Sequence, residues 1–130
     1  MQTNFSQEKT IYVQISEMLE NQILRDIILE EEKVPSTNEF AKMYSINPAT
    51  AAKGINILVD EEILYKKRGI GMFVAAGAKE KIMKRRKNEF YDNYVKKMIE
   101  EAGSLGITSK ELIEMIENGV ANMKEGTNND

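Results

Sequence analysis

The sequence of 130 residues contains neither cysteine nor histidine. Without cysteine, a disulfide framework, a thiol nucleophile and a zinc site with cysteine ligands are excluded. Without histidine, the chain lacks the commonest general base and the commonest metal ligand. The acidic clusters at residues 30–32 and 60–62 fall at expected loops and helix ends, where carboxylates are mostly solvated. We therefore expect no enzyme, no metal site and no cofactor.

Long apolar runs are missing as well. No stretch approaches the roughly 18 apolar residues that a membrane-spanning helix needs. The first residues, MQTNFSQEK, lack the order of charged, apolar and small residues that marks a signal peptide. We therefore expect a cytoplasmic protein with no membrane partner. Its length suits one domain and an appendage.

Positive charge is scarce at both ends of the chain and concentrated in the middle. Residues 1–32 and 100–130 each hold two basic and seven acidic residues, whereas residues 33–99 hold fourteen basic and seven acidic ones, a net charge of +7. A basic centre is one electrostatic footprint for a polyanion. The alternative is that the run KEKIMKRRK forms the solvated face of a helix. Charge alone does not decide between these interpretations.

Local signals predict three helices in the first half of the chain. Helical spacing of apolar residues favours a helix over residues 11–28. Ser36 and Glu39 form the two ends of a capping box that opens a short helix, whose inward candidates are Phe40, Ala41 and Met43. Asn47-Pro48 predicts the cap and first turn of a third helix, with an inward stripe of Ala51, Gly54, Ile55 and Leu58.

A hairpin and two further helices are expected after the third helix. Residues 63–67 and 72–75 are strand-like and flank a glycine-bearing turn. Residues 79–102 and a segment opened by a second capping box, Thr108 to Glu111, have helical patterns. The predicted fold is mainly α with a small β-hairpin: a winged helix-turn-helix domain at residues 8–76, two dimerisation helices at 77–124 and a frayed tail at 125–130.

The third helix carries small side chains where a DNA-reading helix must approach the bases. In a winged helix-turn-helix the third helix enters the major groove and the wing lies over the backbone or minor groove. Ala49 can touch a thymine methyl group, Thr50 can bond a phosphate or base edge, and Lys53 can reach a phosphate or guanine. The Asn47-Pro48 start leaves backbone N–H groups for a phosphate. We also expect the basic run 79–87 to flank the duplex.

The segments IYVQI, VPSTNEFA, INPATAAKGINIL and EEILYKKRGIGMFV resemble, in this order, the DNA-binding domain of GntR-type bacterial transcription regulators. The resemblance covers about residues 11–74. The Asn-Pro-x-Thr start and the short two-helix C-terminal part are similar to the YtrA subfamily. The resemblance implies a homodimeric repressor of a twofold-symmetric operator, often in a transporter operon.

The resemblance implies DNA contacts position by position. Thr50, Lys53, Lys67 and Gly71 match the family, whereas Asn38 and Pro48 stand where relatives commonly have DNA-contacting arginines. The missing arginines leave a larger share of the contact to the remaining residues. The complete predicted DNA-binding set is Ser36, Thr37, Asn38, Asn47, Pro48, Ala49, Thr50, Lys53, Lys67, Arg68, Gly69 and Gly71.

The C-terminal helices are too short to form a core alone, and packing against a second copy would cover their apolar faces. The predicted dimer seam comprises Ile82, Phe90, Tyr94, Met98, Leu112 and Ile116. The expected partners are therefore double-stranded DNA and a second copy, and a small-molecule effector is left open. The alternative function is a winged-helix protein–protein interaction module that has lost strong DNA binding.

Overall fold

The computed structural model describes residues 10–128, with side-chain surroundings through residue 126. Residues 8 and 9 of the predicted first domain, and residues 129 and 130 of the predicted tail, lie outside this part. The chain forms two compact units, Met1–Arg86 and Lys87–Asp130. The elements, in chain order, are α1 (Ile11–Leu24), α2 (Thr37–Tyr44), α3 (Pro48–Asp60), β1 (Leu64–Lys67), β2 (Gly71–Val74), α4 (Ala78–Phe90), the π-helical η1 (Tyr91–Val95), α5 (Lys96–Ser104) and α6 (Ser109–Asn128).

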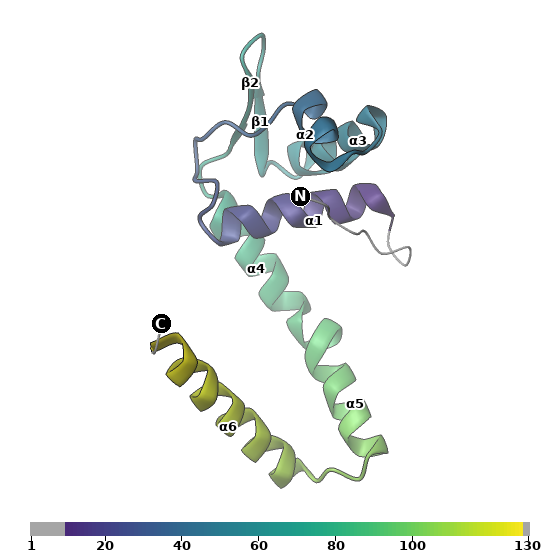
Figure 1. The fold of residues 1–130 in the computed structure, drawn as a ribbon, viewed down its shortest axis with the longest axis vertical. Coiled ribbons are helices and arrows are strands. Elements are labelled where there is room, and N and C mark those ends of the chain that lie inside the picture. The colour runs from purple at the N-terminus through teal and green to yellow at the C-terminus, as the bar shows by residue number, and fades with distance from the viewer. Residues whose placement is uncertain (1–9, 129–130) are drawn as a thin grey trace. The chain divides into compact units, whose positions relative to one another are not determined.

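The first unit is a three-helix cluster with a hairpin beside it, as the sequence predicts. In Figure 1, α1 crosses below α2 and α3 while β1 and β2 project next to them. Helix α1 buries Ile15, Leu19 and Ile23, whose spacing of four residues places them on one face. Helix α3 buries the predicted stripe of Ala51, Gly54, Ile55 and Leu58. Met43, predicted to face inward, is instead 56% exposed.

The starts of α2 and α3 are fixed by the capping residues that the sequence predicts. Ser36 Oγ accepts a hydrogen bond from the Glu39 N–H at 3.1 Å, and Glu39 Oε1 accepts from the Ser36 N–H at 3.2 Å. The pKa of Glu39 is held below its usual value, mainly by the hydrogen bond from the Ser36 N–H and next by the hydrogen bond with the Ser36 side chain. Pro48 occupies the first turn of α3, where its missing N–H costs no helical bond.

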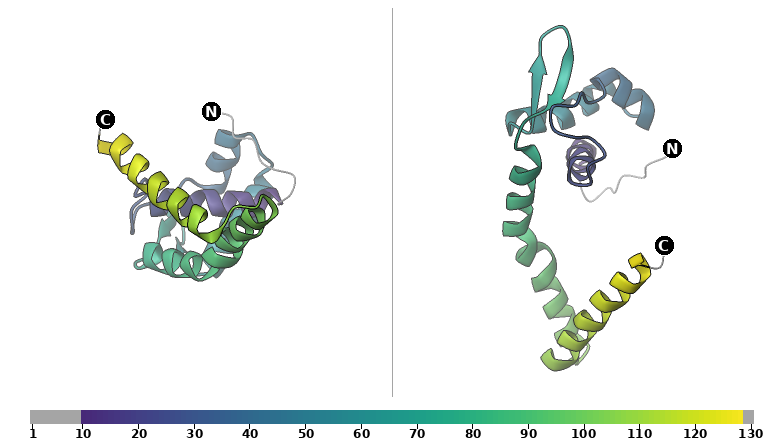
Figure 2. Two further views of the ribbon diagram at one scale, coloured as in Figure 1. Left: turned by 90° about the horizontal axis from the view of Figure 1, so that it is seen from below. Right: turned by 90° about the vertical axis from the view of Figure 1, so that its left-hand side faces the viewer.

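The hairpin is braced by a third extended segment. Strands β1 and β2 are antiparallel, with Tyr65 opposite Phe73 and Lys67 opposite Gly71. The right-hand view of Figure 2 shows the two strands side by side. Residues 31–34 run along the free edge of β2, because the Val34 N–H donates to the Met72 carbonyl at 2.9 Å and the Val74 N–H donates to the Glu32 carbonyl at 3.0 Å. The edge of β2 is therefore paired next to the α2 cap.

A buried carboxylate joins the middle of α4 to α1. Glu20, 2% exposed, accepts from Arg85 at 2.5 Å and from Arg86 at 3.0 Å. The arginines also donate to Glu61 and Asn21, respectively. The first unit therefore extends through Arg86, beyond the predicted boundary after residue 76.

The structure contradicts one prediction about α4 and weakens the support for another. Ile82 has 0% exposure inside the hydrophobic core of the first unit, so its side chain cannot join a dimer seam. The basic run was expected to flank DNA, but four of its cations bond within the first unit. Lys79 pairs with Asp26, Lys81 approaches Glu62, and Arg85 and Arg86 share Glu20.

The second unit contains the end of the long helical stretch and α6. The predicted second capping box opens α6: Thr108 Oγ1 accepts from the Glu111 N–H at 3.2 Å, and Glu111 Oε1 accepts from the Thr108 N–H at 3.3 Å. Helix α6 continues to Asn128, so residues 125–128 are helical where a frayed tail was predicted. None of the helices within residues 10–128 is long and apolar enough to cross a membrane.

Candidate nucleic-acid interface

Helix α3 presents a leading face of small and polar side chains to solvent. Its first residues are exposed at Pro48 and Ala49 and half-buried at Thr50, and Lys53 is exposed one turn later. The residues of the inward stripe are buried, so the two predicted faces of the helix are distinct. The exposed face has room for the close approach that base contacts require.

The N-terminus of α3 differs from the prediction in one respect. Asn47 was expected to leave backbone N–H groups free for a phosphate. Instead, Asn47 Oδ1 accepts from the Ala49 N–H at 2.7 Å. The cap therefore occupies one of these donors, and Pro48 has none to offer. The predicted phosphate contact at this end loses part of its basis.

Lys53 is oriented by an aromatic ring from α1. Its Nζ lies 4.2 Å from the centroid of the Tyr12 ring, within the range of a cation–π interaction. Gly54 brings the two helices together at this point, since a Cβ there would lie 2.6 Å from the Tyr12 carbonyl oxygen. The close approach of α1 and α3 thus determines where this cation stands.

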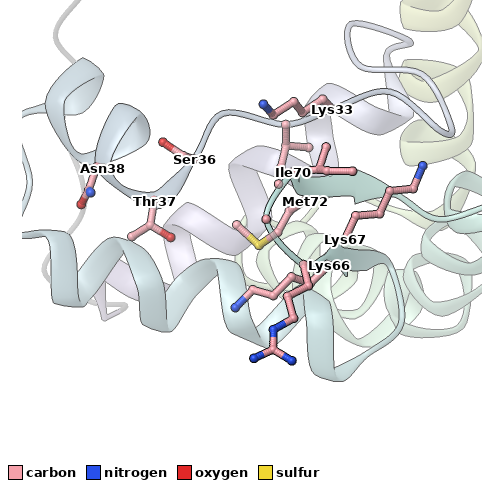
Figure 3. Close-up of a pocket in the computed structure, with 12 residues that line it drawn as sticks. Lys33, Ser36, Thr37, Asn38, Lys66, Lys67, Ile70 and Met72 are labelled. Carbon is pink, nitrogen blue, oxygen red and sulfur yellow. The ribbon is translucent and has the colours of Figure 1, made fainter.

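A groove of about 490 Å³ separates the start of α2 from the wing. Figure 3 shows Ser36, Thr37 and Asn38 on the α2 side and Lys66, Lys67 and Ile70 from the hairpin. Seven of the twelve predicted DNA-binding residues line the groove: Ser36, Thr37, Asn38, Lys67, Arg68, Gly69 and Gly71. The other five, Asn47, Pro48, Ala49, Thr50 and Lys53, belong to α3 and its cap.

The groove is cationic. Four of its lining residues are basic, namely Lys33, Lys66, Lys67 and Arg68, and none of the lining residues, all within the described chain, is acidic. Lys67 Nζ lies 4.6 Å from the centroid of Phe73, which supports it on the outer face of the hairpin. Lys66, opposite Met72, belongs to the other face because side chains alternate along a strand. The wing therefore carries cations on both faces.

Two residues of this interface were missing from the sequence-based set. Lys66 adjoins the predicted wing residues, so the basic run in the wing could have indicated it. Lys33 reaches the groove because residues 31–34 pair with β2, and its bridge partner Phe73 is 40 positions away in the sequence. No local sequence signal predicts a contact between residues this far apart in the chain.

The second unit has an apolar groove of about 430 Å³ between α5 and α6. Three of the predicted seam residues, Met98, Leu112 and Ile116, line it. Phe90 and Tyr94 are exposed, with ring centroids 5.3 Å apart. The five remaining seam residues thus all belong to a unit with a large exposed apolar surface.

Known proteins share the sequence and fold described above. Residues 11–74 match the model for bacterial regulatory proteins of the gntR family. The HTH-type transcriptional repressor YtrA of Bacillus subtilis (strain 168) is 30% identical over 120 residues, 92% of each chain. The HTH-type transcriptional regulator YhcF of the same strain, which is uncharacterized, is 29% identical over 128 residues, covering 97% of this chain and 99% of that one.

Solved structures give the same result. The crystal structure described as that of a GntR-family transcriptional regulator from Bacteroides thetaiotaomicron has a TM-score of 0.71 and 34% identity, and the match covers 87% of this chain and 98% of that one. The DNA-binding domain of AraR in complex with operator ORX1 has a TM-score of 0.50 and 32% identity over 58% of this chain and 92% of that one. The chain belongs to the GntR family of DNA-binding transcription regulators.

Proposed function

We propose that this chain is a sequence-specific repressor that binds a twofold-symmetric operator as a homodimer. The observation that carries the DNA contact is the cationic groove between the start of α2 and the wing, which brings four basic side chains together without a lining carboxylate. Phosphates favour such a surface, and the release of their counterions drives binding. The similarity to the repressor YtrA supports repression, and the YtrA-like resemblance makes a transporter operon the expected target.

Base reading is assigned to α3. Ala49 and Thr50 face away from the buried stripe, and the small side chains let the helix enter the major groove. Lys53 extends the same face and is held by Tyr12. Lys67 and Arg68 in the wing contact the backbone, which fixes the position of α3 without reading sequence.

Dimerisation is assigned to the second unit. Its helices expose large apolar side chains, including Phe90, Tyr94 and Ile116, and a second copy would remove this surface from water. A twofold dimer also presents two copies of α3 to half-sites that are one or more helical turns apart. The groove between α5 and α6 is the centre of the proposed seam.

The first experiment measures binding to the duplex DNA upstream of the chain's own gene by fluorescence anisotropy at several salt concentrations. A random-sequence duplex of equal length is the reference. We expect tighter binding to the upstream duplex and a steep loss of affinity with salt. Affinity that stays constant between low and moderate salt would contradict the proposal.

Variants then test the assigned residues. Thr50→Ala should weaken binding to the upstream duplex by about 1–3 kcal/mol while changing the random duplex little, because a base contact carries specificity. Lys67→Met should weaken both duplexes alike. Lys110→Met removes the same charge from the exposed start of α6 and should leave both affinities unchanged. Full specificity in the Thr50 variant would remove α3 from the base-reading role.

Sedimentation analysis tests the dimer. Ile116→Glu places a charge in the apolar groove and should shift the protein to monomer at micromolar concentration. Ile27→Glu is the matched control, since Ile27 is exposed in the first unit. If Ile116→Glu sediments as the unmodified protein does, the seam is assigned wrongly.

The alternative function, a winged-helix protein–protein interaction module, uses the same cationic surface to bind an acidic protein. The upstream and random duplexes separate the two functions. Equal, weak binding to both would favour the interaction module.

A further inference from the structure

The position of Lys33 in the groove between α2 and the wing is fixed by the backbone. Its backbone lies within the segment that pairs with β2, where the residues on either side are hydrogen-bonded to Met72 and Val74. Val34, the next residue, is buried in the core. The segment therefore cannot rotate freely, and the Lys33 side chain is directed along the outer face of the hairpin.

Gly71 makes room for this side chain. A Cβ at position 71 would lie 2.6 Å from Cε and 3.5 Å from Nζ of Lys33. Gly71 also has a φ of +145°, which L side chains rarely adopt. The backbone conformation and the missing side chain at position 71 thus allow the Lys33 side chain to lie across the hairpin next to its turn.

The groove around Lys33 has an excess of positive charge. Lys66, Lys67 and Arg68 line the same groove, whose lining has no carboxylate among the described residues. The nearby Glu39 carboxylate interacts electrostatically with Lys33. Its oxygen Oε1, however, accepts a hydrogen bond in the α2 capping box. Ser36 Oγ accepts from the Glu39 N–H, so its own hydroxyl hydrogen can be donated to an anion.

We propose that this groove is a phosphate clamp for one strand of the operator backbone, and that Lys33 is its central positioning cation. The clamp holds a phosphodiester between the start of α2 and the wing, with Lys67 and Arg68 on the hairpin side and the Ser36 hydroxyl on the α2 side. Lys67 lies on the hairpin face that Lys33 follows. The inference rests on the proposed function and deepens it, because it assigns backbone binding to a segment outside the helix-turn-helix and the wing. The ligand is a phosphodiester of any sequence, so the contact adds affinity and register but no base specificity.

The test compares Lys33→Met with the unmodified chain on the upstream and random duplexes. Methionine keeps an unbranched stem and removes the charge. If one phosphate contact is lost, the slope of log K against log[salt] becomes shallower by about 0.9. Affinities that are equal at 1 M salt then differ by about eightfold at 0.1 M, and the loss is the same for both duplexes. Lys33→Arg should restore the slope, and Lys110→Met should not change it.

The outcomes separate this clamp from the proposed function. If the unmodified chain binds neither duplex at low salt, the proposed function fails and the clamp fails with it. If the unmodified chain binds with a steep slope and Lys33→Met binds with the same slope, the clamp alone is overturned. A loss confined to the upstream duplex would also overturn it, because that pattern belongs to a base contact.

Discussion

Gly54→Ala sets two effects of opposite sign against each other. In an exposed helix interior this substitution stabilises by about 1 kcal/mol, because alanine has the higher helix propensity. At Gly54, however, the new Cβ would lie 2.6 Å from the Tyr12 carbonyl oxygen and 2.9 Å from Cβ and Cγ2 of Ile15. These atoms belong to the backbone and to a fully buried β-branched side chain, so neither can yield without moving α1.

The magnitude follows from the packing. Overpacking a core costs typically about 1–3 kcal/mol, and contacts with a backbone atom and a rigid side chain place Gly54 toward the upper end. After subtraction of the propensity gain, we expect a net loss of about 1–2 kcal/mol in the free energy of unfolding. Because α1 and α3 must separate, operator affinity should fall too.

Urea unfolding at one fixed protein concentration measures the effect. Gly119→Ala is the matched control: Gly119 lies within α6, and a Cβ there would meet nothing within 4 Å. The control should be stabilised by up to about 1 kcal/mol. If Gly54→Ala is as stable as the unmodified chain, or changes in the same direction as Gly119→Ala, the reasoning about close helix packing is refuted.

Three further predictions concern Tyr12, Glu20 and Glu39. Tyr12→Leu should weaken DNA binding about two- to fivefold, as measured by fluorescence anisotropy. Tyr12→Phe should bind DNA as the unmodified chain does, because phenylalanine keeps the ring face that holds Lys53. Glu20→Gln should lower the free energy of unfolding by about 1–2 kcal/mol, less than for a fully buried pair, because its arginine partners are 37% and 35% exposed; urea unfolding measures this. The lowered pKa of Glu39 means that its contribution to stability is present at neutral pH and is lost as the pH falls below the usual glutamate range through that lowered pKa. Unfolding of Glu39→Gln should therefore depend less on acid pH.

Much of the fold could be predicted because its signals are local. Ser36 with Glu39 and Thr108 with Glu111 are capping boxes within four residues, and Asn47 caps the helix that Pro48 begins. Helical spacing likewise identified the buried stripe of α3. The exposed Met43 shows the limit of this reasoning, since a short helix offers too few turns for spacing alone to define its buried face.

What the sequence could not provide depends on long-range pairing. Lys33 enters the groove through a bridge to Phe73, and Glu20 meets Arg85 and Arg86 across more than 60 residues. A run of basic residues looks the same in a sequence whether its charges face DNA or a buried carboxylate. The prediction that residues 79–87 flank DNA loses support for this reason, because four of the cations already bond to carboxylates of the first unit.

The charge available to DNA is the charge that remains after intramolecular pairing. The central region has a net charge of +7, yet the cations of α4 that bond to Glu20, Glu61 and Asp26 are already engaged. The groove cations, by contrast, share a lining without carboxylates. A small set of phosphate contacts in the groove between α2 and the wing can therefore support binding by an acidic chain, provided that the two grooves of the proposed dimer act together. In the proposed dimer the second copy contributes to affinity as well as symmetry, so Ile116→Glu should reduce operator binding even though the first unit and its groove remain intact.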